Sequence, residues 1–265
     1  MKQAELSSAK EYEDQGYFIL RNFFNSQEVS HLTALVDPIF LQWRDGKEAH
    51  IFEHKLLNMH SLTHAGYFER SQTQRLAFFN AILPTKLTQY LDTLFGDGLY
   101  FHNTQLFFNP TNKARLPYWH RDMQYSPIAD EQQAREQLNM LSLHARIPLL
   151  DESGIELIPG SHKRWDTELE RKVRFELEGH EDSEPLADSR LIELSAGDLL
   201  IFNAQMLHRG NYALNQERKA LDLCVGKPHP LSVGFLDKGV LPTMQELAQL
   251  DNPSWYQSAH QLTKN

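Results

Sequence analysis

Apolar positions near the N-terminus follow first a helical pattern and then a short β-prone run. The segment 6–14 is rich in helix formers and ends before Gly16, whereas 17–20 consists of four large apolar or aromatic residues. Glycine commonly separates two such elements because it adopts backbone angles that other residues avoid. The pattern therefore predicts a helix, a turn and a strand.

Two longer helical patterns follow this strand. In the first, apolar residues recur every three or four positions from Val29 until Pro38, and Asn25 or Ser26 can cap the helix. The second covers 73–95, and Pro84 divides it because proline lacks the amide hydrogen that a helix interior needs. These patterns predict a helical N-terminal part of the chain.

The pattern changes from Leu99 onward to short runs of β-branched and aromatic residues separated by turn residues. Helices do not alternate with these runs, so a β-sandwich or barrel such as a jelly roll is favoured over an α/β fold. The predicted strands lie near 99–108, 117–124, 138–149, 154–158, 190–194, 198–203, 206–213 and 218–226.

We expect a single, mainly β domain over 1–265. Helices over about 1–97 should pack outside a jelly-roll core over about 98–228, with a tail or helix over about 229–265. A charged excursion, 166–189, interrupts the strands. Long loops inside compact domains are commonly lids or binding loops, and a solvated insertion fits this composition equally well.

Composition narrows the function. The chain has 26 Lys plus Arg against 35 Asp plus Glu, a formal net charge of −9, which argues against nonspecific nucleic-acid binding. It contains no apolar run long enough to span a membrane and no readable secretory signal. Cys224 is the only cysteine, which excludes Cys-rich metal sites and favours a reducing compartment. We expect a cytoplasmic protein.

The 13 histidines are the most informative part of the composition, because imidazole is the commonest ligand of transition metals. His120 and Asp122 are two residues apart in a predicted strand, so both side chains should point to one face. Such a pair supplies two ligands of the facial triad that holds non-haem iron(II). His180 and Asp182 repeat the spacing inside the charged excursion, where we interpret them as solvated surface residues.

The third ligand should come from a strand late in the chain. A strongly β-prone run ends at His208, and Arg218 follows it ten residues later, beyond a turn-rich segment. If the two residues flank a hairpin, both side chains can face the same interior. Arg218 would then offer a planar guanidinium to a carboxylate bound beside the metal.

Several ordered motifs together resemble one family. HRD at 120–122, IPGSHKRW at 158–165, AGDLLIFNAQMLHRGN at 196–211 and Arg218 are similar to the motifs of the phytanoyl-CoA dioxygenase family of Fe(II)/2-oxoglutarate oxygenases. The segment 16–24, followed by a helix, also resembles the start of that family's domain. Four elements with matching spacing are far more specific than a single His-x-Asp pair.

The resemblance covers about residues 8–228 and implies a double-stranded β-helix with His120, Asp122 and His208 as iron ligands. It also implies that Arg218 binds the distal carboxylate of 2-oxoglutarate. Gln105 or Asn103 would help to hold this cosubstrate, and the register of the strand leaves open which of the two points inward. His144 stands where many relatives have an aromatic residue, so that wall of the pocket is expected to differ.

Other residues near the motifs could line a substrate pocket, although ordinary packing fits each of them as well. They are Arg121, Tyr125, His162, Trp165, Met206 and Arg209. The arginines among them, together with Arg164, would favour an anionic substrate if they faced the cavity.

The resemblance implies an Fe(II)- and 2-oxoglutarate-dependent dioxygenase that uses O2 and releases succinate and CO2. Hydroxylation of a C–H bond is preferred to halogenation, because halogenating relatives carry a small residue where this chain has Asp122. The alternative is a noncatalytic jelly roll that binds a metal or a small acid. A hydrolytic metalloenzyme would not need Arg218. The substrate and the oligomeric state are not determined by the sequence.

Overall fold

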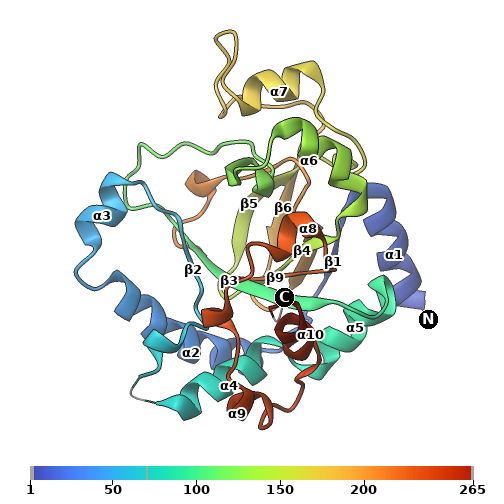
Figure 1. Ribbon diagram of the computed structural model, residues 1–265. Helices are drawn as coiled ribbons and strands as arrows, with labels where there is room; N and C mark the ends of the chain where they lie inside the picture. The colour runs from blue at the N-terminus through green and yellow to red at the C-terminus, as the bar shows by residue number, and fades with distance from the viewer. Residues whose placement is uncertain (1–2, 70, 264–265) are drawn as a thin grey trace.

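The computed structural model describes residues 3–69 and 71–263 and contains two antiparallel sheets (Figure 1). The larger sheet has the strand order β1-β7-β4-β9-β3-β2, and the smaller sheet has the order β6-β5-β8. This arrangement, with helices on the outside, confirms the predicted jelly-roll fold class. The strands are β1 (Tyr17–Leu20), β2 (Asn58–His60), β3 (Tyr100–Phe108), β4 (Ser142–Pro148), β5 (Glu152–Leu157), β6 (Arg190–Leu194), β7 (Leu199–Asn203), β8 (His208–Gly210) and β9 (Lys219–Gly226).

Side chains along the central strands alternate between the hydrophobic core and a cavity on the opposite face of the sheet. On β4, Leu143, Ala145 and Ile147 belong to the main hydrophobic core, whereas His144 and Arg146 point to the opposite face. The same alternation on β9 places Asp222 among the residues that line a cavity. Because successive side chains on a strand point to opposite faces, one face of the larger sheet is apolar and the other carries the polar groups.

Helices cover the apolar face of the larger sheet (Figure 1). The main core joins buried residues of these helices to those of β3, β4 and β9. Among the described residues, no helix is both long and apolar enough to cross a membrane. The helices are α1 (Gln3–Gln15), α2 (Ser26–Arg44), α3 (Glu48–Glu53), α4 (Gln72–Ile82), α5 (Thr85–Phe95), α6 (Asp130–Glu136), α7 (Glu168–Arg174), α8 (Pro230–Val233), α9 (Met244–Leu247) and α10 (Ser254–Leu262).

The N-terminal elements match the hydrophobic pattern with one correction. The strand over 17–20 and the helix break near Pro84 lie where the sequence predicts them. The helix expected to end at Pro38 continues to Arg44. The proline removes one backbone hydrogen bond, but burial of Ile39 just beyond it, 3% exposed, favours continuation.

The turn before β1 requires a glycine. Gly16 has φ +88, and a Cβ atom there would lie 2.5 Å from Nδ1 of His162. Any other residue would be strained and would also collide with this imidazole. Close packing at Gly16 lets β1 pair with β7, with Tyr17 opposite Phe202.

Two strand predictions in the site region are wrong. The run 117–124 is not a strand, because it makes only an isolated bridge at His120 and then turns into a 3-10 helix over Asp122–Tyr125. The strand predicted over 206–213 is limited to His208–Gly210. Apolar residues in both runs are buried without continuous hydrogen bonding to a neighbouring strand. Composition alone therefore predicts strands that are too long.

The charged excursion 166–189 carries α7 and lies at one end of the molecule, where Figure 1 shows it in yellow. A capping box starts this helix, since Thr167 and Glu170 satisfy each other's backbone N–H groups. Val173 and Leu186 are buried against Trp119. The segment is therefore packed against the domain at several points, which the charge pattern did not predict.

Candidate metal and cosubstrate site

His120 and His208 are held side by side by the backbone. Each N–H donates to the other residue's carbonyl at 3.0 Å, in the isolated bridge that joins residue 120 to β8. Asp122 follows at the start of the 3-10 turn, where its N–H donates to the carbonyl of Ala204 at 3.2 Å. The three side chains converge through this turn and not through the strand alternation expected from the sequence.

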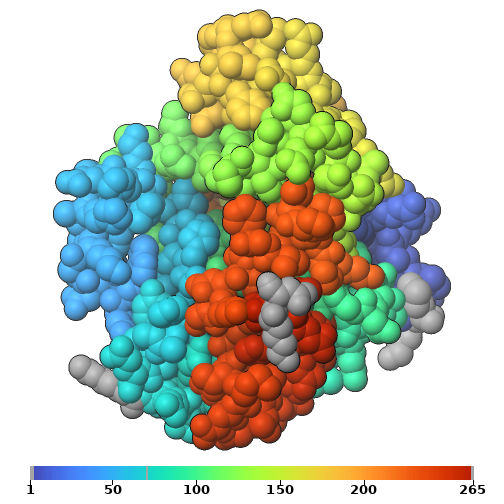
Figure 2. All heavy atoms as spheres, in the orientation of Figure 1, coloured from blue at the N-terminus to red at the C-terminus, as the bar shows by residue number. Residues whose placement is uncertain are grey.

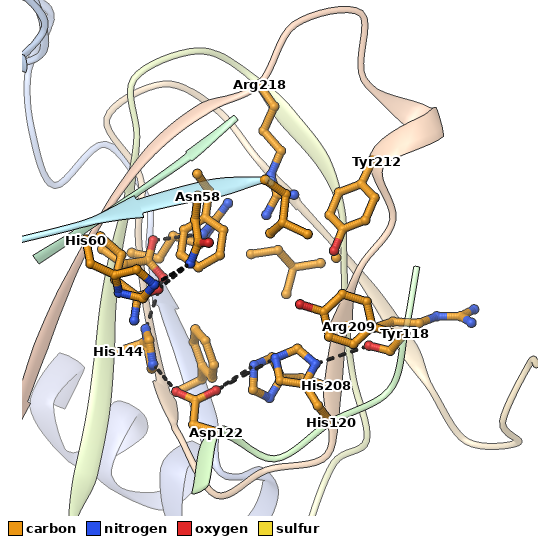
Figure 3. A pocket seen from close by; sticks show the side chains of 18 of the residues that line it. Asn58, His60, Tyr118, His120, Asp122, His144, His208, Arg209, Tyr212 and Arg218 are labelled. Carbon is orange, nitrogen blue, oxygen red and sulfur yellow. Dashed lines mark hydrogen bonds and ion pairs between the residues drawn. The ribbon is translucent and has the colours of Figure 1, made fainter. Parts of the chain in front are cut away.

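The three side chains offer ligand atoms to one point. These atoms all lie within 4.8 Å of one another. Oδ1 of Asp122 is 3.3 Å from Nε2 of His208 and 3.8 Å from Nε2 of His120 (Figure 3). Two imidazoles and one carboxylate on one side of a metal leave positions open on the other, as in non-haem iron oxygenases.

Hydrogen bonds fix both imidazoles in the tautomer that a metal needs. Nδ1 of His120 lies 3.1 Å from the carbonyl of Tyr118, and Nδ1 of His208 lies 2.9 Å from that of Met206. A carbonyl only accepts, so each Nδ1 carries the hydrogen and each Nε2 keeps a free lone pair. Burial and the nearby His208 lower the pKa of His120 to about 3, which keeps this ring neutral.

The second oxygen of Asp122 is bound by His144, whose Nε2 lies 2.5 Å from Oδ2. Although burial favours its protonated form, His144 outweighs burial and holds the pKa of the Asp122 carboxyl well below its usual range. Nδ1 of His144 lies 3.1 Å from Oδ2 of Asp222. His144 thus bridges two carboxylates and leaves Oδ1 of Asp122 to face the other two candidate ligands.

A buried chain of charges continues from Asp222 to Arg218. Nη1 of Arg146 donates to Asp222 at 2.8 Å, and Nε of Arg146 donates to Glu152 at 2.6 Å. The other oxygen of Glu152 accepts from Nε of Arg218 at 3.3 Å. Strands β4, β9 and β5 contribute to this chain, which connects the two sheets.

Arg218 has the properties of a carboxylate receptor. Its side chain is 4% exposed, and among the described residues its buried Nη1 has no hydrogen-bond partner. Leaving a guanidinium nitrogen unpaired costs free energy, so the geometry favours a bound acceptor. Burial and the neighbouring Arg146 lower the pKa of Arg218, and Glu152 offsets them only in part. A dicarboxylate reaching from the triad fits the donors present.

A cavity of about 420 Å3 joins the triad to Arg218 (Figure 3). Gln105 lines it and accepts a hydrogen bond from Asn58 at 3.0 Å. Asn103 does not line it and donates instead to Ser61. Of the two residues that the register left open, Gln105 is therefore the one placed at the cavity.

Some wall residues were not recognised in the sequence. Asn58 and His60 come from β2, which has only three residues and gives no periodic signal. Tyr212 lies in a 3-10 turn, and Tyr118 precedes His120 by two residues. Asp222 is a charged residue that interrupts the apolar run before Cys224. This interruption is the one signal in the sequence that could have identified a wall residue of the cavity.

The expected substrate-pocket residues are only partly at the cavity. Tyr125 and Arg209 line it. The other four do not: Arg121, His162, Trp165 and Met206 lie outside it. Met206 is fully buried in a small apolar cluster, and His162 packs against the ring of Tyr12.

Arg121 is a structural residue in the fold. It is fully buried and donates to the carboxylate of Asp166 at 2.8 Å and to the carbonyls of Ser161 and Gln205. Trp165 stacks on the same guanidinium, with 4.8 Å between the arginine carbon and the ring centre. Because Arg121 stands between His120 and Asp122 in the chain, these contacts anchor the backbone that presents both residues.

The arginines expected to favour an anion are paired with carboxylates. Arg164 pairs with Glu170 at 2.6 Å, and Arg209 pairs with Glu156 at 3.0 Å. Together with the Arg121–Asp166 pair, these contacts neutralise all three guanidinium groups. The basis for expecting an anionic substrate is therefore lost.

Comparison with known proteins places the chain in one family. Residues 12–220 match the sequence model of phytanoyl-CoA dioxygenase (PhyH). An ectoine dioxygenase of Sphingopyxis alaskensis is 27% identical over 165 residues, which cover 60% of this chain and 50% of that protein. The chain thus spans about half the length of this curated relative.

Solved structures share the fold at low sequence identity. EctD from S. alaskensis with 2-oxoglutarate and 5-hydroxyectoine is 18% identical with a TM-score of 0.59, covering 86% of this chain and 76% of that chain. HygX from Streptomyces hygroscopicus, with nickel and 2-oxoglutarate bound, is 13% identical with a TM-score of 0.60, covering 86% and 87%. The chain belongs to the phytanoyl-CoA dioxygenase family, a family of Fe(II)- and 2-oxoglutarate-dependent oxygenases whose cofactors are iron, 2-oxoglutarate and O2.

Proposed function

We propose that this protein is a 2-oxoglutarate-dependent hydroxylase of a small molecule, with His120, Asp122 and His208 as its Fe(II) ligands. The observation that carries the proposal is the convergence of this triad and the unpaired nitrogen of Arg218 on one cavity. When bound, iron and 2-oxoglutarate supply the oxidising power that converts a C–H bond and O2 to an alcohol, with succinate and CO2 released.

The protein's own residues provide geometry and charge. His120 and His208 would offer the Nε2 lone pair to the metal, because their Nδ1 atoms face main-chain carbonyls. His144 holds the Asp122 carboxylate, and Arg218 would pair with the distal carboxylate of 2-oxoglutarate, with Gln105 on the neighbouring wall. Hydroxylation is favoured over halogenation because Asp122 occupies the position that would otherwise receive a halide.

Relatives support a small-molecule substrate without naming it. The names of the similar proteins refer to ectoine dioxygenase, a carbocyclase of nogalamycin biosynthesis and an epimerase of the same biosynthesis. These outcomes differ, so the comparison supports the oxygenase class more strongly than any one reaction. Hydroxylation remains the proposal on the basis of Asp122.

Anaerobic titration with Fe(II) and 2-oxoglutarate tests the assignment. The wild type should develop a weak visible charge-transfer band. H120A and D122A should lose both Fe(II) binding and this band. H180A is the matched control, because His180 and Asp182 repeat the spacing in the charged excursion. R218A should still bind Fe(II) but need much more 2-oxoglutarate. An unchanged band in both ligand variants would remove these residues as ligands, and an unaltered 2-oxoglutarate requirement would remove Arg218.

A noncatalytic binding module is the alternative function. It would bind Fe(II) or a small acid yet release no succinate under O2, with or without added substrate. Succinate formed in proportion to O2 consumed would exclude this alternative.

A further inference from the structure

A second cavity, of about 330 Å3, lies against the first one. The two cavities share Gln105, Asp122, Tyr125 and His144 as wall residues. They therefore meet at the proposed iron-binding carboxylate, with Arg218 lining only the first cavity. We call the second cavity the apolar chamber.

The apolar chamber differs from the first cavity in charge. Arg146, Arg209 and Arg218 all line the first cavity. The described residues that line the chamber include no Lys or Arg, and their only carboxylate is Asp122. Its apolar wall includes Met123, Met140, Leu141, Val225, Leu231 and Phe235. The one cation among these described wall residues, His144, is already paired with Asp122 and Asp222. A cavity without an unpaired cation does not favour a carboxylate or a phosphate, because a buried charge needs a partner.

The chamber opens between α8 and the turn that follows Asp122. At this rim, Tyr125 is 63% exposed and Phe235 is 50% exposed. Figure 2 shows the orange segment that carries α8 lying against the green segment near α6. His229, which caps α8, lies 3.3 Å from Glu136 of α6. Two large exposed aromatic side chains at the mouth of an apolar cavity favour an apolar ligand.

One irregularity of β3 directs a polar group into the chamber. The pairing of β3 with β9 shifts between Phe101 and Asn103, which leaves His102 as the extra residue of a β-bulge. Phe101 remains in the core, so the bulge places Tyr100, His102 and Gln105 all at the chamber wall. Bulges commonly redirect a side chain next to an active site. Burial lowers the pKa of His102, so this imidazole is neutral.

We propose that the apolar chamber binds the body of the substrate, and that the substrate is an uncharged, mainly apolar small molecule with one polar group positioned by His102. This inference rests on the proposed function, because it takes the iron site at Asp122 as the place of reaction. It also separates this chain from a relative that acts on ectoine, since a zwitterion would find no unpaired cation among the described residues of the chamber.

Two dyes with the same ring system test the charge preference on the protein alone. N-phenyl-1-naphthylamine is uncharged, and 8-anilino-1-naphthalenesulfonate carries a sulfonate on the same body. We expect the uncharged dye to bind with a stoichiometry of one and the sulfonate to bind at least about tenfold more weakly. Equal binding of both dyes, or tighter binding of the sulfonate, would overturn the inference.

Variants locate the binding. L231R and F235R each place a cation at the chamber and should weaken binding of the uncharged dye at least about tenfold. L138R is the matched control, because Leu138 is 73% exposed and lines neither cavity. Using the exposed Phe235 as a second position protects the test if L231R does not fold. Retained binding in both chamber variants would place the dye elsewhere and contradict the proposal.

A turnover panel separates this inference from the proposed function. Succinate release by the wild type should rise with uncharged apolar compounds and not with ectoine, amino acids or coenzyme A thioesters. H102A should raise KM for an accepted compound more than it lowers kcat. If the Fe(II)–2-oxoglutarate band forms but only charged compounds stimulate succinate release, the chamber assignment alone fails. If the band is absent, the proposed function fails instead.

Discussion

At the scale of single residues, Asp198 shows how one buried carboxylate can fix two turns. Its side chain is 2% exposed. It accepts hydrogen bonds from the backbone N–H groups of Asn22 and Ser195 at 2.9 Å and from Arg21 at 2.6 Å. These bonds connect the end of β1 to the turn between β6 and β7.

We predict that D198N destabilises the protein by roughly 1.5–3 kcal/mol at neutral pH, the usual range for hydrogen bonds to a charged group. Burial alone would raise the pKa of Asp198, but its N–H donors and Arg21 outweigh burial and lower it. The stabilisation is therefore present above the unfolded pKa of about 4 and is lost as the pH falls through the lower folded pKa.

Urea unfolding of wild type and D198N from neutral to acid pH checks this expectation. The difference in unfolding free energy should shrink as the pH falls. D151N is the control, because Asp151 is exposed and bonds to Ala196 in the same turn. A difference that stays constant with pH would show that the charge of Asp198 is not the cause.

Single residues were also predicted with unequal success. The sequence identified His120, Asp122, His208 and Arg218 because their types and spacing are distinctive, and the structure brings all four to one cavity. It could not separate Arg121 from the pocket, since a buried arginine paired with a distant carboxylate has no local signature. The partner of Arg121, Asp166, lies 45 residues along the chain.

At the scale of elements, the sequence predicted helices and strands correctly where an apolar pattern repeats over many residues. It failed where one or two residues determine a turn or a bulge. The helices α4 and α5 and the strand β1 follow the apolar pattern closely. The turn at Asp122 and the bulge at His102 each depend on one residue and on pairing with distant strands. Because such irregularities shape the site, its finer geometry could not be predicted from sequence.

The excursion 166–189 depends on one carboxylate. Both Arg121 and Arg174 donate to Asp166 at 2.8 Å, and all three side chains are fully buried. We predict that D166N destabilises the protein by roughly 3–5 kcal/mol, because it leaves two buried guanidinium groups without this charge. The excursion should also become more sensitive to protease, since Asp166 lies at its start.

Limited proteolysis followed by mass spectrometry measures this effect directly. Cuts within 166–189 should appear faster in D166N than in the wild type. E168A is the control, because Glu168 lies in the same excursion but is 84% exposed and makes a surface ion pair with Lys172. Equal cleavage of D166N and E168A would show that Asp166 does not anchor the segment.

At the scale of the whole molecule, buried charged residues form one continuous series of contacts, which we call the charge chain. It joins the proposed metal ligands to the proposed binding site for the distal carboxylate of 2-oxoglutarate. It runs from Asp122 through His144, Asp222, Arg146 and Glu152 to Arg218. Its members come from both sheets, so the fold of the jelly roll fixes the position of Arg218 relative to the metal ligands. A periodic pattern in the sequence cannot reveal this chain, because each link joins a different strand.

Glu152 is the member that holds two arginines at once. Its two oxygens accept from Nε and Nη2 of Arg146 at 2.6 and 2.7 Å and from Arg218 at 3.3 Å. We predict that E152Q destabilises the protein by roughly 3–5 kcal/mol, because both guanidinium groups stay buried with less compensating charge. It should also weaken 2-oxoglutarate binding several-fold, because Arg218 loses the contact that orients it.

E156Q is the matched control. Glu156 is also on β5 and pairs with a buried arginine, Arg209, but neither residue belongs to the series of buried charges from Asp122 to Arg218. Both variants should lose stability in urea, but only E152Q should need more 2-oxoglutarate to develop the Fe(II) band. Saturating 2-oxoglutarate should recover part of the stability lost in E152Q, since a ligand that binds only the folded state stabilises it. The same 2-oxoglutarate requirement in both variants would mean that Arg218 is positioned without Glu152, and that the charge chain supports the fold alone.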